Sequence, residues 1–294
     1  MISLKKINKQ TVKAIPIPNE DTRPIKGFKI CEEVYANIFL CAKKKSGKTS
    51  AIFKIIKECS NKDTIIIIFC STVYKDKNWI QMRKHFEKKN EIRVFTSIYE
   101  DGEDQLHKLI NDLNCQAQEN KNDENNEKES EELEIDRCDD IIEKLKNHYL
   151  SSIGKGTPKE ENEDAENNKK KQRKSKHRAP EYIIVFDDLS TELKSRSLLD
   201  LLKKNRHYKT KLIISSQWVH DLLPESRKQI DLFLIFKGFS DAKMKELYKD
   251  SDSSIPFETF IEVYKKATEL PYSFLYVDTR SDSFRCCFDK QFIL

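Results

Sequence analysis

Short runs of consecutive apolar residues recur along the chain with few polar interruptions. The clearest are rich in β-branched and aromatic residues and lie at 38–41, 64–70, 92–95, 182–186, 211–217, 232–236 and 273–277. Strands of a parallel sheet that is covered by helices on both faces have this appearance, because neither face alternates with polar residues. The pattern therefore predicts a mostly parallel central sheet, with further strands at 28–30 and 284–294.

Between these runs, apolar residues recur with the spacing of a helix rather than a strand. The clearest example is the set Ile52, Ile55, Ile56 and Cys59, and similar spacing predicts helices around 79–89, 106–113, 198–202, 242–248 and 257–267. Strands that alternate with helices favour an α/β protein in which helices cover both faces of the sheet. We expect a three-layer α/β fold.

The composition changes sharply in the middle of the chain. Residues 119–136 are rich in Asn and Glu, and residues 169–178 are almost wholly basic. Such segments bury too little apolar area to offset the entropy lost on ordering. We therefore predict an N-terminal arm at 1–30, a core formed by 31–115 and 181–294, and a charged, largely disordered insertion at 116–180 that holds one short amphipathic helix near 141–149.

Charge and cysteine content narrow the class of protein. The net charge is +5, yet the segment 116–180 has more acidic than basic residues, so the rest is more basic than the total. A basic folded part favours a polyanionic partner, although surface lysines also serve solubility. The eight cysteines form no C-x-x-C pair, and no apolar run reaches the ~18 residues of a membrane span. These features predict a soluble intracellular protein without a zinc site or a disulfide framework.

The segment Cys41–Ser50, of sequence CAKKKSGKTS, matches most of the phosphate-loop pattern G-x-x-x-x-G-K-S/T. It departs at Ala42, which stands in place of the first glycine, so the backbone there must avoid positive φ. In such a loop the backbone N–H groups surround phosphate, the lysine reaches the terminal phosphates and the hydroxyl binds Mg²⁺. We expect ATP and Mg²⁺ to bind here, through the residues Lys44, Lys45, Ser46, Gly47, Lys48, Thr49 and Ser50, although Lys44 and Lys45 could equally form a solvated basic patch.

Two later strands end in residues that suit nucleotide hydrolysis. The run Tyr182–Phe186 ends in Asp187 and Asp188. Asp187 is the expected metal ligand and Asp188 the expected group that orients or deprotonates water, while the alternative for the pair is a turn or helix cap. Gln217 ends the run that begins at 211, and its amide could bind a γ-phosphate and a water, or else only satisfy backbone groups.

The order of these motifs resembles the genome-packaging ATPases of nucleocytoplasmic large DNA viruses, virophages and polinton-like elements, within the FtsK–HerA superfamily. The set comprises the loop AKKKSGKT, the strand that ends in Asp187 and Asp188, the segment Asn205–His207 and the strand that ends in Gln217. The resemblance implies a RecA-like P-loop NTPase core with Walker A and Walker B motifs. It also implies a homo-oligomeric ring that pulls double-stranded DNA into a capsid.

The same resemblance implies roles for single residues. Asp188 would activate water, Gln217 would sense the γ-phosphate, and Arg206 would reach the nucleotide of a neighbouring subunit, with Arg227 in reserve. Asp188 stands where many relatives have Glu, which shortens the reach to water. The implied partners are DNA and capsid or portal proteins, and the implied location is the virus factory in the host cytoplasm or the virion.

Two other classes of function are compatible with the sequence. One is a different P-loop enzyme, such as a helicase or a nucleoside kinase. A kinase needs an arginine-rich lid over the phosphates, and residues 220–294 contain no such cluster. The other is a capsid-associated protein that binds a nucleotide without hydrolysing it.

Overall fold

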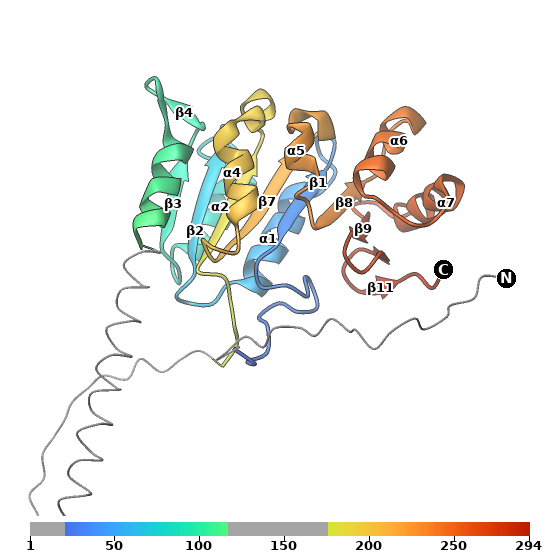
Figure 1. The fold of residues 1–294 in the computed structure, drawn as a ribbon, viewed down its shortest axis with the longest axis horizontal. Helices are drawn as coiled ribbons and strands as arrows, with labels where there is room; N and C mark the ends of the chain where they lie inside the picture. The colour runs from blue at the N-terminus through green and yellow to red at the C-terminus, as the bar shows by residue number, and fades with distance from the viewer. Residues whose placement is uncertain (1–20, 117–175) are drawn as a thin grey trace, which may run out of the picture.

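The computed structural model describes residues 21–116 and 176–294, and these form a sheet with helices on both faces (Figure 1). The strand order in the nine-stranded sheet is β11-β10-β9-β8-β1-β7-β6-β2-β3. The bounds are β1 (Asn37–Cys41), β2 (Ile65–Cys70), β3 (Ile92–Phe95), β6 (Tyr182–Asp187), β7 (Thr210–Ser216), β8 (Leu232–Phe236), β9 (Phe274–Asp278), β10 (Ser283–Cys286) and β11 (Lys290–Gln291). A separate hairpin joins β4 (Tyr99–Glu100) to β5 (Glu103–Asp104).

The sheet is parallel from β3 to β8 and antiparallel from β8 to β11. The predicted α/β class and the mostly parallel sheet are therefore confirmed. Strand β1 lies in the middle, between β7 and β8. The carboxyl ends of β1, β6, β7 and β8 consequently meet at one edge of the sheet, where ligands of α/β proteins usually bind.

Two hydrophobic clusters cover the two faces of the sheet, and successive residues of each strand alternate between them. In β1, Phe39 and Cys41 belong to one cluster, whereas Ile38 and Leu40 belong to the other. The first cluster includes side chains of α4 (Arg196–Lys204), α6 (Asp241–Asp250), α7 (Phe257–Ala267) and the helix at 105–116. The second includes side chains of α1 (Lys48–Cys59) and α2 (Lys77–Phe86). Because both faces are buried, the strand sequences show no polar alternation.

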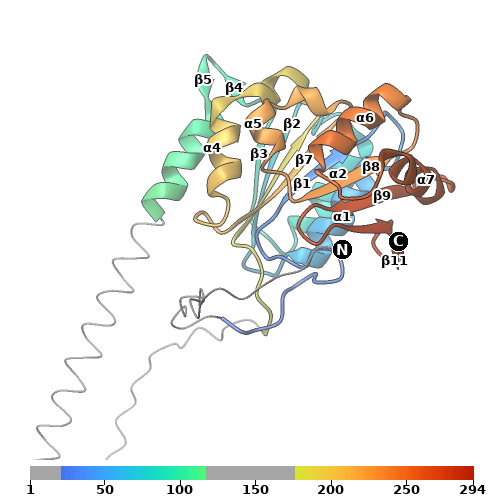
Figure 2. The same ribbon diagram turned by 45° about the vertical axis from the view of Figure 1, so that its right-hand side comes forward.

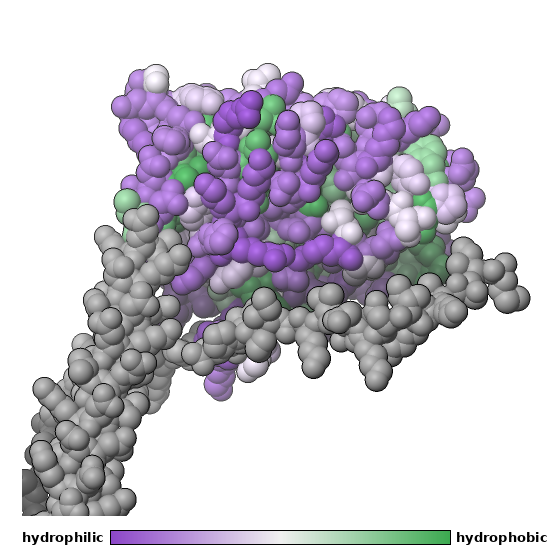
Figure 3. All heavy atoms as spheres, in the orientation of Figure 1, coloured by the Kyte–Doolittle hydropathy of each residue, from purple (hydrophilic) through white to green (hydrophobic). Residues whose placement is uncertain are grey.

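The helices turn hydrophilic faces to solvent. Figure 3 shows the side of the molecule that carries α4, α6 and the short helix α5 (Pro224–Arg227), and its surface is mostly hydrophilic. Figure 2 shows the same helices packed on the sheet from a second direction. Within the described part of the chain, no helix combines the length and hydrophobicity that crossing a bilayer would require.

Two strand predictions were wrong. Residues 28–30 form turns, with the Ile30 N–H donating to the Gly27 carbonyl at 2.8 Å, so they pair with no strand. The predicted single strand at 284–294 is two short antiparallel strands, β10 and β11. Phe284 and Ile30 are apolar because they pack into the two core clusters, not because they lie in long strands, whereas Phe28 is exposed. The predicted insertion and its short helix lie mostly outside the described residues.

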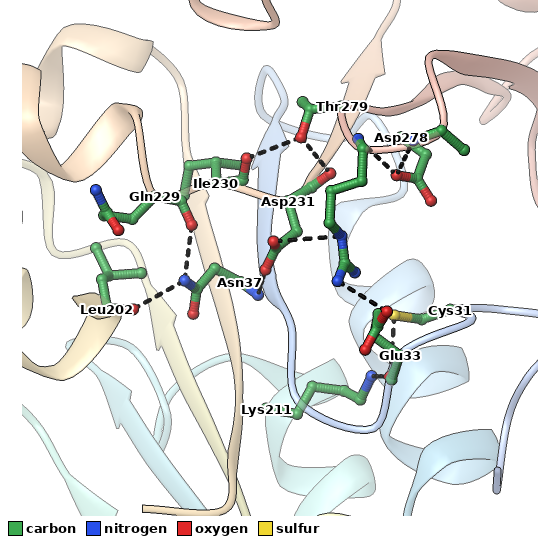
Figure 4. A network of polar contacts seen from close by, with 12 residues as sticks. Cys31, Glu33, Asn37, Leu202, Lys211, Gln229, Ile230, Asp231, Asp278 and Thr279 are labelled. Atoms are coloured by element: carbon green, nitrogen blue, oxygen red, sulfur yellow. Dashed lines mark hydrogen bonds and ion pairs between the residues drawn. The ribbon is translucent and has the colours of Figure 1, made fainter. Parts of the chain in front are cut away.

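A polar network joins the segments at the amino-terminal edge of the sheet (Figure 4). The Asn37 backbone N–H donates to Asp231 Oδ2 at 2.8 Å, and the Asn37 amide donates to the carbonyls of Leu202 and Gln229 at 3.1 and 2.7 Å. Arg280 pairs with Asp231 and Glu33. The buried Lys211 ammonium donates to the Glu33 carbonyl at 2.7 Å. These contacts fix the start of β1 relative to β7, β8 and the residues after β9.

Candidate functional site

The turn between β1 and α1 contains two residues in the left-handed region. Lys45 and Gly47 have positive φ, at 61° and 97°, whereas Ala42 is not among the described residues with positive φ. The missing first glycine is therefore tolerated, because the left-handed positions fall at 45 and 47. Helix α1 begins at Lys48, so its first N–H groups and positive dipole end face the loop.

The structure brings this loop to the two carboxylates at the end of β6. Lys48 Nζ lies 2.9 Å from Asp187 Oδ1 and 2.5 Å from Asp188 Oδ1. Lys48 and Asp188 are 140 residues apart in the sequence, and the contact arises because β1, β7 and β6 run parallel side by side. A cationic segment and an acidic segment thus share one edge of the sheet.

Burial and neighbouring charges both shift the pKa values of Asp187 and Lys48. Burial raises the pKa of Asp187, the charge of Asp188 raises it further, and the Lys48 ammonium opposes both. Burial would lower the pKa of Lys48, but the two carboxylates outweigh this effect and the pKa lies above its ordinary value. Lys48 is therefore held protonated beside Asp187 and Asp188.

Trp79 is a site residue that sequence reasoning missed. Its indole Nε1–H donates to Asp187 Oδ2 at 3.0 Å, and both side chains are 1% exposed. Ser71, which follows β2, donates to the Asp188 carbonyl at 3.0 Å. The sequence predicted a helix near Trp79 but gave no sign of a contact with Asp187, because that contact depends on the pairing of β2 with β6.

A hollow of about 920 Å³ opens over the loop. Asp188 also lines it, together with Asp76 and Asn78 from the start of α2 and the aromatic residues Tyr272, Phe274 and Phe288. Six of the seven residues predicted to bind nucleotide line the hollow, namely Lys44, Lys45, Gly47, Lys48, Thr49 and Ser50. The seventh, Ser46, has a buried hydroxyl without a hydrogen-bond partner among the described residues.

Gln217 directly follows β7, which lies between β1 and β6. Its backbone carbonyl lies 3.9 Å from the Cys41 thiol, and its side chain is exposed. Gln217 is thus at the same edge as Lys48 and Asp187 but does not line the hollow. Nearby Ser215 has a buried hydroxyl with no hydrogen-bond partner among the described residues, whereas the Ser216 hydroxyl donates to Asp221.

The two arginines proposed as fingers lie away from this cluster. Arg206 is exposed and precedes β7, so it lies at the amino-terminal edge of the sheet, where its charge acts on Asp231. Arg227 forms an ion pair with Asp250 at 3.2 Å and is 13% exposed. Arg206 therefore does not approach the Lys48 cluster of its own chain.

The donor groups around Lys48 suit Mg²⁺ held jointly with phosphates. The described residues contain no cluster of three or more His, Cys, Asp and Glu side chains that could hold a metal alone. Mg²⁺ is usually bound through one or two carboxylates together with substrate phosphates. The Asp187 carboxylate and the Thr49 hydroxyl, at adjoining strand and helix ends, fit this type of site.

The fold and site define a three-layer α/β protein with a phosphate-loop turn facing an acidic strand end. Residues 157–288, which are less than half of the chain, match the family described as Poxvirus A32 protein. This confirms the resemblance to viral genome-packaging ATPases. The matched residues include Asp187, Asp188 and Gln217 but not the phosphate loop.

Other known proteins are similar over different parts of the chain. The uncharacterized protein 075L of Invertebrate iridescent virus 6 is 28% identical over 102 residues, which are 34% of this chain and 40% of that protein. The genome packaging NTPase B204 of Sulfolobus turreted icosahedral virus 2, in complex with AMP, aligns with 86% of this chain and 97% of its own, at 17% identity and a TM-score of 0.48. Its complex with ATP-gammaS aligns at 18% identity, with shares of 86% and 96% and a TM-score of 0.45.

Proposed function

We propose that the chain is an ATP-hydrolysing translocase that packages double-stranded viral DNA into a capsid. The observation that carries this proposal is the convergence of Lys48 with Asp187 and Asp188, at 2.9 and 2.5 Å, on the carboxyl edge of a parallel sheet. Phosphate loops and acidic strand ends meet in this way in P-loop ATPases. The match of residues 157–288 to the family described as Poxvirus A32 protein supports the viral role.

In this proposal the loop holds the triphosphate. The N–H groups at the start of α1 point toward the phosphates, and Lys48 exchanges its carboxylate partners for phosphate oxygens. Thr49 and Asp187 would hold Mg²⁺, which neutralises charge that develops on the phosphates during transfer. The hydrogen bond from Trp79 keeps Asp187 in one orientation.

Asp188 is the proposed general base for the attacking water. Its side chain is 36% exposed and lines the hollow, and its φ of 55° is unusual for a residue other than glycine. Such strained backbone often marks a functional site. Gln217, next to the same edge, would bind the γ-phosphate or the water through its amide.

The position of Arg206 restricts any catalytic role of this residue to a contact between subunits. Because Arg206 lies at the opposite edge of the sheet from Lys48, it would reach a nucleotide only in a neighbouring subunit. An arginine supplied by a neighbouring subunit increases the rate of hydrolysis by a factor on the order of 10³–10⁵. We therefore propose a homo-oligomeric ring around DNA, with capsid or portal proteins as partners, that acts in the cytoplasm of the infected cell and is carried into the virion.

Phosphate release from ATP, measured with and without duplex DNA, tests this function. We expect hydrolysis that DNA stimulates and that falls to background in Lys48→Ala. Asp188→Asn should still bind ATP but stop turnover. Hydrolysis that DNA leaves unchanged would contradict translocation, and no hydrolysis at any protein concentration would favour a nucleotide-binding protein without catalysis. Circular dichroism of each variant controls for folding.

A further inference from the structure

The hollow over the phosphate loop has an aromatic end that the proposed chemistry does not use. Asp188 follows β6, two strands from β1 on one side, whereas Tyr272 precedes β9, two strands from β1 on the other side. β9 runs antiparallel to β8, and its first residue, Phe274, pairs with Phe236 at the end of β8. The carboxylates and Tyr272 therefore flank the phosphate loop from opposite sides at the same edge.

Tyr272 lies directly against the loop, yet little of its side chain is buried there. A Cβ atom added to Gly47 would be 3.2 Å from both Cβ and Cδ1 of Tyr272. The Tyr272 side chain is nevertheless 73% exposed, and its φ is 63°. A tyrosine in the left-handed region that exposes most of its ring is strained without an evident packing gain.

The turn that presents Tyr272 is firmly held. The Ser273 hydroxyl donates to the Leu270 carbonyl at 2.6 Å, and the Ser273 N–H donates to the same carbonyl at 3.3 Å. Behind it, the ring of Phe274 contacts those of Phe236 and Phe288, each at 5.0 Å between centroids. The ring of Tyr272 thus stands on a fixed turn next to an aromatic wall that lines the same hollow.

We infer that Tyr272, backed by Phe274 and Phe288, binds the base of the nucleoside triphosphate whose phosphates occupy the loop. This inference rests on the proposed nucleotide site. With the terminal phosphate beside Lys48 and Asp188, the sugar and base extend away from β6, toward β9. A base that stacks on an aromatic ring is held through its π-face, which every base possesses, so the contact tolerates different bases.

Binding of two probes in the presence of Mg²⁺ tests the inference by calorimetry: a non-hydrolysable ATP analogue, which has a base, and inorganic tripolyphosphate, which has none. Tyr272→Ala should weaken binding of the ATP analogue about 10-fold and leave tripolyphosphate binding unchanged. Tyr272→Phe should keep near-normal affinity, since the ring remains. The corresponding GTP analogue should lose affinity to a similar extent in Tyr272→Ala. Tyr99→Ala, at another exposed tyrosine, is the matched control.

Each other outcome overturns the inference. An equal loss for both probes in Tyr272→Ala would mean that Tyr272 only supports the loop, and no loss for either would mean that it contacts nothing bound there. The proposed function fails separately. If Tyr272→Ala shows the selective loss but the wild-type chain releases no phosphate, the base site stands and the ATPase proposal fails. If the wild-type chain binds neither probe, both fail.

Discussion

At the scale of single residues, the site depends on how a buried carboxylate is compensated. Asp187 is 1% exposed and has two partners, the Lys48 ammonium and the Trp79 indole N–H. A buried charge is costly unless it is paired and hydrogen-bonded. The same contacts that offset this cost also orient the carboxylate toward the loop, so stability and positioning are linked at this residue.

The Trp79 contact leads to the first prediction. Trp79→Phe removes the donor to Asp187 Oδ2, and we expect a loss of about 1–3 kcal/mol in unfolding free energy. We also expect half-maximal phosphate release to require more Mg²⁺, because Asp187 is less well oriented. Met82→Leu, a volume-conserving change on the same buried face of α2, is the control. An unchanged Mg²⁺ requirement would limit Trp79 to a structural role.

At the scale of elements, the phosphate loop is shaped by the strand before it and the helix after it. β1 is held on both sides by parallel strands, and Gly47 with its φ of 97° turns the chain into α1. On the other side of the loop, α2 begins at the N-cap Asp76, whose side chain accepts from the Asn78 N–H at 2.7 Å. This cap starts the helix that carries Trp79 to Asp187.

Gly47 provides the second prediction. Gly47→Ala places a side chain at a positive φ and 3.2 Å from Tyr272, so the backbone is strained and either the loop or Tyr272 must shift. Gly102→Ala is a matched control, because Gly102 has a φ of 80° and nothing within 4 Å of an added Cβ. Both variants should lose about 1–2 kcal/mol of stability, but only Gly47→Ala should lose ATP affinity in a calorimetric titration. Equal ATP affinity in the two variants would contradict this role of the loop.

At the scale of the whole molecule, the sheet is tied together at the edge opposite the site. Asp231 accepts from the Asn37 N–H, pairs with Arg280 and lies near the charges of Arg206 and Glu33. Burial raises the pKa of Asp231, against the opposing effects of the Asn37 hydrogen bond and the two arginines. These contacts fix β1 against β8, and β1 leads directly into the loop.

The raised pKa of Asp231 sets the sign of a pH effect, the third prediction. The folded state takes up a proton at Asp231 more readily than the unfolded state, so this group favours folding more as the pH falls through its folded pKa toward the ordinary value of 3.8. Asp231→Asn removes this titration. In urea unfolding from pH 7 to pH 4, wild type should gain stability relative to Asp231→Asn. A relative loss on acidification would contradict the prediction.

Assembly gives the fourth prediction, which concerns Arg206. Arg206→Ala alone should be nearly inactive in phosphate release, because the proposed ring would then lack the residue proposed to reach the neighbouring nucleotide. Mixing it with Lys48→Ala should restore part of the activity, since a mixed ring has interfaces with an intact loop and an intact arginine. Lys203→Ala, an exposed cation at the end of α4, should need no such rescue. Failure of the mixture would make Arg206 a surface cation.

Much of the fold was readable from local pattern. Uninterrupted apolar runs located β1, β2, β3, β6, β7, β8 and β9, and the 3.6-residue spacing located α1, α4 and α7. The hydrophobic pattern predicted strands wrongly where strand formation depends on contacts between distant residues. The apolar residues at 28–30 form turns, and the C-terminal run is divided by the turn between β10 and β11.

The sequence by itself determined the class of fold, the phosphate-loop motif and the acidic strand end, because each depends on neighbouring residues with a fixed period or spacing. Tertiary structure alone decided which strands are neighbours. The contacts of Trp79 with Asp187 and of Tyr272 with Gly47, and the placement of Arg206 at the far edge, follow from that strand order. Strands buried on both faces show no alternation, so their sequences do not reveal their partners.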